Sequence, residues 1–139
     1  MSLSISDDIR LALTDPKRTD YYAASLTRTI LGHQLVIEVV IGLGSEALAH
    51  QIARHLAISG RRSDIVRSCA ATSQNGVWSL DPSYQELARD RQVLIVVPSH
   101  QSLEEIIPPD LIVLVKSVGG ILKGVLYYDG SLLTTSTGW

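Results

Sequence analysis

The chain has 139 residues, a formal net charge of −2 and a pI near 6.0. This balance argues against a surface built to bind nucleic acid or an anionic membrane. Cys69 is the single cysteine, which excludes an internal disulfide and a cysteine-based metal cluster. There is no apolar run of about 18 residues and no signal-peptide pattern at the N-terminus. A soluble, cytoplasmic protein that contacts neither membrane nor nucleic acid is therefore expected.

Helical periodicity dominates the N-terminal segment, residues 1–33. Two helices are predicted there, over residues 4–13 and 19–31, with Gly32 as the C-terminal cap of the second. A β-branched run then predicts a strand over residues 35–41, apolar enough to be covered on both faces.

An amphipathic helix follows this first strand almost at once, over residues 45–59. The side chains expected to face the core from it are Leu48, Ile52 and Leu56. A short second strand is predicted over residues 65–68, then a turn-rich segment over 69–83 and a short helix over 83–89. Whether the turn-rich segment closes over a ligand is left open.

The remaining strands are predicted over residues 93–97, 111–115, 121–128 and 131–135. A brief helix over residues 103–107 separates the first two of these. Asp129-Gly130, between the last two, is a two-residue hairpin signal. Residues 119–139 are therefore expected to form a C-terminal β-hairpin.

Alternating strands and helices predict a single α/β domain over residues 1–139, of a Rossmann-like kind. The expected architecture is a mainly parallel sheet of about four strands flanked by helices, closed by the C-terminal hairpin. Ligands of such sheets bind beyond the carboxyl ends of the strands. Candidate site residues are therefore sought where strands end.

A glycine-containing turn joins the first strand to the helix that follows it. It comprises Gly42, Leu43, Gly44, Ser45 and Glu46. Glycines let the backbone approach a ligand, and a helix N-terminus offers free N–H groups and a partial positive charge. The turn is therefore a candidate phosphate-binding loop. The alternative is a tight strand–helix turn with no ligand.

A second candidate loop follows the strand over residues 93–97. It comprises Ser99, His100, Gln101 and Ser102. His100 could act near neutral pH or be an idle surface histidine. Ser102 could bind an anion or simply cap the next helix. Arg67, at the predicted end of the second strand, could reach a phosphate or remain solvated. No catalytic residue and no metal site can be assigned.

From Ile37 to about Val97 the order of elements resembles that of a type I phosphoribosyltransferase, the orotate-using branch most closely. The glycine turn corresponds to a pyrophosphate loop, and Ile65-Val66-Arg67 to a strand ending in a basic residue. The family's next apolar strand continues into two acidic residues, where this chain has Val97-Pro98. The resemblance implies a protein that binds a phosphorylated metabolite or nucleotide, with catalysis degenerate. It implies magnesium only if phosphoribosyl pyrophosphate binds.

Two other functions stay open. Gly42 to Ala47 also match the G-x-G-x-x-A pattern of dinucleotide-binding domains, and Val93–Ile107 resembles a segment of NAD-dependent glycerol-3-phosphate dehydrogenases. This similarity implies an NAD- or NADP-binding domain. The second is a non-enzymatic interaction module that forms a homodimer or pairs with another chain through the hairpin at Tyr127–Thr135.

Overall fold

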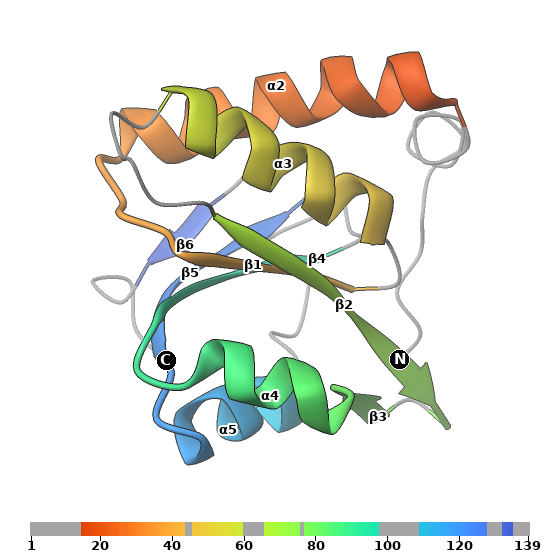
Figure 1. Ribbon diagram of the computed structural model, residues 1–139, viewed down its shortest axis with the longest axis vertical. Helices are drawn as coiled ribbons and strands as arrows, with labels where there is room; N and C mark the ends of the chain where they lie inside the picture. The colour runs from red at the N-terminus through yellow and green to blue at the C-terminus, as the bar shows by residue number, and fades with distance from the viewer. Residues whose placement is uncertain are drawn as a thin grey trace.

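The computed structural model describes residues 15–43, 46–59, 66–75, 77–97, 109–127 and 132–134. Its strands are β1 (Val39–Leu43), β2 (Arg67–Gln74), β3 (Val77–Ser79), β4 (Gln92–Val97), β5 (Ile121–Tyr127) and β6 (Leu132–Thr134). Its helices are α2 (Pro16–Gly32), α3 (Glu46–Ser59), α4 (Pro82–Ala88) and α5 (Pro109–Ser117). The strands form one sheet with helices on both faces, which confirms the predicted α/β class (Figure 1).

The sheet has the strand order β3-β2-β1-β4-β5-β6. Strands β2, β1, β4 and β5 are mutually parallel, whereas β3 and β6 pair antiparallel at the two edges. The parallel part has four strands, as the predicted fold class does, but the fourth is β5 rather than the strand predicted over residues 111–115. Strands β5 and β6 form the expected C-terminal hairpin, and the two edge strands make the sheet mixed.

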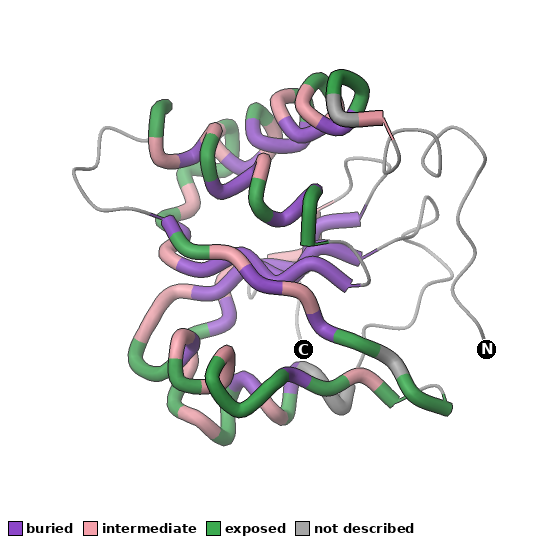
Figure 2. The backbone as a smooth tube through the Cα atoms, turned by 45° about the vertical axis from the view of Figure 1, so that its right-hand side comes forward, coloured by how far each residue is buried: buried purple, intermediate pink, exposed green. Residues whose placement is uncertain are grey.

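The core consists of two layers of apolar side chains, one on each face of the sheet. Val40 of β1 packs in the layer under α2 and α3, whereas Val39 and Ile41 pack in the layer that faces α4 and α5. This alternation follows from the period of two along a strand. Figure 2 shows the central strands buried between the two helical layers, which explains their continuous apolar sequence.

Residues 111–115 were predicted as a strand and are instead part of helix α5. Ile112 and Val115, three positions apart, are buried, while Val113 between them is 65% exposed. This spacing is helical. Pro109 at the first helical position also suits a helix start. The prediction was wrong because the preference of β-branched residues for strands is weak. Here it is outweighed by packing of a helix against the face of the sheet that α4 also covers.

The turn-rich segment predicted over residues 69–83 contains most of β2 and all of β3. Gln74 pairs with Val77, so two residues separate the paired ends of β2 and β3. Asn75 has φ 53, the left-handed conformation that Asn tolerates in such turns. The prediction missed the strands because Asn-Gly was read as one polar tract with its neighbours.

Helix and strand ends differ from prediction by a few residues elsewhere. The first strand begins at Val39 rather than residue 35, and α2 begins at Pro16, with Asp15 as its N-cap. Gly32 is still helical, and His33 is the C-cap. The helices predicted over residues 4–13 and 103–107 lie outside the described residues. Within the described residues, no helix is long and apolar enough to cross a membrane.

Candidate functional site

The order of strands reverses at β1. Strands β2 and β4 lie on either side of β1 in the sheet. The chain passes from β1 through α3 to β2, and then from β3 through α4 to β4. Helices α3 and α4 cover opposite faces of the sheet (Figure 1). In an open parallel sheet, such a reversal leaves a crevice at the carboxyl ends of the two central strands. The crevice expected here lies beyond Leu43 of β1 and Val97 of β4.

The structure places part of the predicted glycine turn at the point where the strand order reverses. Gly42 and Leu43 end β1, with Gly42 paired to Val96 of β4, and Glu46 begins α3. Gly44 and Ser45, which connect the two elements, lie outside the described residues. A short connection between a buried strand and a 14-residue helix is therefore present where the sequence predicted it.

The second predicted loop, Ser99, His100, Gln101 and Ser102, lies outside the described residues. Its position in the chain is fixed by β4, because Val97 is the last residue of that strand and the loop begins two residues later. The loop therefore follows the strand that pairs with β1.

The structure corrects the predicted position of Arg67 in its strand. Arg67 opens β2 rather than ending a strand, and it pairs in register with Val39 at the start of β1. Its N–H donates to the carbonyl oxygen of Glu38 at 3.0 Å. The carboxyl end of β1 lies four residues further on, about 13 Å away at the rise of a strand. Arg67 is thus not brought together with Gly42 and Glu46, because the strand continues to Gln74.

Cys69 of β2 pairs in register with Ile41 of β1 and is a poor nucleophile at neutral pH. Its side chain is fully buried in β2. Burial, together with the negative charge of Glu46, raises the pKa of the Cys69 thiol to about 12. Among the residues that the structure describes, no group of three or more His, Cys, Asp or Glu side chains could hold a metal ion.

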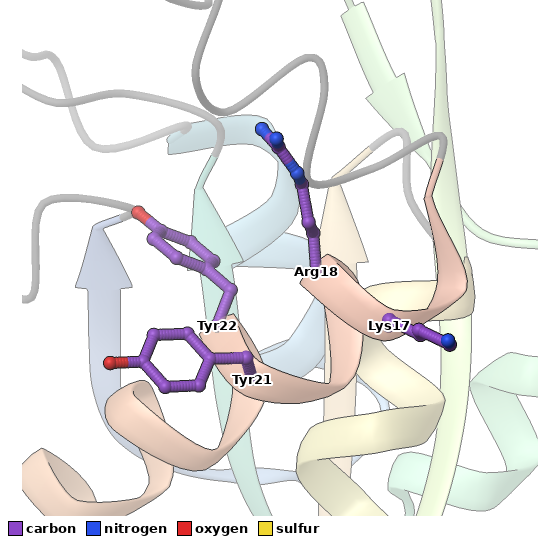
Figure 3. A pocket seen from close by; sticks show the side chains of 4 residues that line it. All are labelled: Lys17, Arg18, Tyr21 and Tyr22. Atoms are coloured by element: carbon purple, nitrogen blue, oxygen red, sulfur yellow. The ribbon is translucent and has the colours of Figure 1, made fainter.

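A pocket of about 370 Å³ opens on the first two turns of α2 and was not predicted. Its lining side chains are Lys17, Arg18, Tyr21 and Tyr22 (Figure 3). Helix α2 begins on the side of the molecule where β1 and β4 end (Figures 1 and 2). The missed signal is the helical spacing of four, which puts Lys17 and Tyr21, and likewise Arg18 and Tyr22, on one face of the helix.

One carboxylate anchors α2 to α3 next to this pocket. Asp20 accepts hydrogen bonds from the Arg54 guanidinium and from Nε2 of His55, the latter at 2.9 Å. These two donors hold the pKa of Asp20 below its usual value. The contact fixes the position of the pocket-bearing turns relative to the helix that follows β1.

No protein-family model matches this chain, and no curated protein matches it. Among solved structures, the orotate phosphoribosyltransferase of Francisella tularensis matches 83% of this chain with a TM-score of 0.54 and 10% sequence identity. The fold is similar to that of a type I phosphoribosyltransferase. The match covers 53% of the enzyme, so this chain spans about half the length of that protein. At this identity the likeness shows the fold alone.

Proposed function

We propose that this protein binds the phosphate of a phosphorylated metabolite or nucleotide beyond the carboxyl ends of β1 and β4. The observation that supports this most is the Gly42–Glu46 connection at the reversal point of the sheet. A phosphoribosyltransferase-like fold is consistent with a ligand at this edge.

The physical basis is the start of α3. Its first N–H groups have no acceptor within the helix, and the dipole of a 14-residue helix favours an anion beyond Glu46. Glycine at position 44 would allow the phosphate to approach the backbone closely. The hydroxyl groups of Ser99 and Ser102 would add donors from the loop after β4.

Catalysis is proposed to be degenerate. Strand β4 ends at Val97, and Pro98 follows, where the family that the sequence resembles has two acidic residues. A valine and a proline offer no carboxylate to hold the hydroxyl groups of a ribose ring. We therefore expect binding without transfer of a phosphoribosyl group, and a role for magnesium only if phosphoribosyl pyrophosphate is the ligand.

Thermal shift and calorimetry with a ligand panel test the proposal. The panel contains pyrophosphate, ribose 5-phosphate, mononucleotides, and phosphoribosyl pyrophosphate with and without magnesium. At a hundred times its Kd, a ligand should stabilise the fold by about 2.7 kcal/mol. Gly44→Val should weaken binding at least about tenfold. The matched control is Gly32→Val, because a side chain at Gly32 meets nothing within 4 Å.

Unchanged binding by Gly44→Val would show that the phosphate site is wrongly placed. Release of pyrophosphate from phosphoribosyl pyrophosphate in the presence of a base would overturn degenerate catalysis. A shift with NAD or NADP alone would favour a dinucleotide-binding domain instead, a reading that the strand order also suits.

A further inference from the structure

The pocket on α2 combines two cationic and two aromatic side chains in a volume suited to a small ligand. Its volume of about 370 Å³ falls within the range of small-molecule sites. Lys17 and Arg18 lie in the first turn of α2, and Tyr21 and Tyr22 lie one turn further. Side chains four residues apart share one face of a helix, and Arg18 lies next to Tyr22, whereas the Lys17 side chain extends away from Tyr21 (Figure 3).

The two cations of the pocket do not stabilise the helix that carries them. Cations in the first turn oppose the helix dipole, so Lys17 and Arg18 are placed where a helix by itself disfavours them. Arg18 lies 3.7 Å from a carboxylate oxygen of Asp15, and both side chains are about half exposed. Among the described residues, the ammonium group of Lys17 has no acidic partner within 4 Å.

The other nearby carboxylate is already occupied. Asp20 accepts from Arg54 and from His55 of α3. Its negative charge is thus shared with a guanidinium outside the pocket. Among the described residues at the start of α2, Lys17 therefore carries a positive charge that no carboxylate balances.

The tyrosines offer a platform for a planar ring. Tyr21 is 76% exposed, so its ring is open to a ligand from solvent. Tyr22 is half buried and packs against the core layer under α2 and α3, so its ring is held in place. Figure 3 shows both rings extending to the same side of the helix, with Arg18 next to Tyr22. Tyrosine rings and guanidinium planes both stack on aromatic bases.

We infer that this pocket binds an aromatic ring that carries or adjoins an anionic group. The ligand class is therefore nucleotides rather than sugar phosphates. The inference rests on the proposed function, because the pocket lies on the same side of the molecule as the ends of β1 and β4 (Figures 1 and 2). The turn before α3 would hold the phosphate, and α2 would select the base.

Calorimetry with purine and pyrimidine mononucleotides and with ribose 5-phosphate tests this selection. Mononucleotides should bind at least about tenfold more tightly than ribose 5-phosphate. Tyr21→Leu and Arg18→Gln should each weaken mononucleotide binding about tenfold and leave ribose 5-phosphate binding unchanged. Arg28→Gln is the matched control, because Arg28 is an exposed arginine of the same helix more than two turns away. Both substituted side chains are exposed, so the Tm without ligand should not change.

The outcomes separate this inference from the proposed function. Equal binding of mononucleotides and ribose 5-phosphate, unaffected by the α2 variants, would overturn the pocket and leave the phosphate site intact. Mononucleotide binding weakened by Tyr21→Leu but not by Gly44→Val would support the pocket and overturn the phosphate site. Absence of binding by every ligand would overturn both.

Discussion

Asp20 connects α2 and α3 through one carboxylate, and its contribution to stability should depend on pH. Because its folded-state pKa is lowered, this contribution is present above the unfolded pKa, near 3.9, and is lost as the pH falls through the lower folded value. Asp20→Asn should therefore lower the Tm slightly at pH 7. The wild type and the variant should converge as the pH falls below the folded-state pKa of Asp20.

Asp90→Asn provides the control for this experiment, since it removes the same charge from an exposed residue. Asp90 has φ 57, a conformation that Asn also tolerates. A Tm difference for Asp20→Asn that stays constant from pH 7 to pH 3 would show that ionisation of the carboxylate does not stabilise the helix pair.

Gly120 is required by packing rather than by backbone conformation. A Cβ atom there would lie 2.7 Å from Cγ1 of Val115 and 2.9 Å from its carbonyl oxygen. Gly120→Ala should therefore destabilise the fold by about 1–3 kcal/mol in a denaturant titration. Gly32→Ala should be neutral or stabilise by up to about 1 kcal/mol, because the space around Gly32 is open. Equal effects of the two variants would show that the contact at Gly120 can relax.

At the scale of one element, α3 stabilises the fold through its buried face. Ile52 is fully buried in the core layer, whereas Ile58 of the same helix is 70% exposed. Ile52→Ala should lower the free energy of unfolding by about 2–5 kcal/mol, and Ile58→Ala should change it by less than about 0.5 kcal/mol. Denaturant titration of both variants measures this. A small effect at Ile52 would mean that α3 does not pack on the sheet as described.

At the scale of the whole molecule, the rate at which a reagent labels the Cys69 thiol measures how often the sheet opens. The thiol is buried between strands and its pKa is raised to about 12, so few molecules carry a reactive thiolate at pH 8. Labelling by a thiol reagent should be at least about a hundredfold slower in the folded protein than in denaturant. It should accelerate with the same denaturant midpoint as global unfolding. Rapid labelling of the native protein would show that β2 opens locally.

The positions of the candidate site residues were only partly predictable. The sequence placed Gly42, Leu43 and Glu46 between a strand and a helix, as the structure has them, because a glycine turn between an apolar run and an amphipathic helix is a local pattern. Arg67 was misplaced because the length of β2 depends on pairing with β1 and β3, which local sequence does not reveal. The α2 pocket was missed because its cations and tyrosines become neighbours only when the helical start is known.

The sequence by itself determined the α/β class, the parallel core, the helix at 46–59 and the C-terminal hairpin, because each rests on a local period or turn signal. Tertiary structure decided whether Leu111 to Val115 form a strand or a helix, since their composition suits both and the sheet face demanded a helix. It also decided the strand order and the antiparallel direction of each edge strand. Those properties arise from long-range pairing, whose free energy depends on residues far apart in the chain.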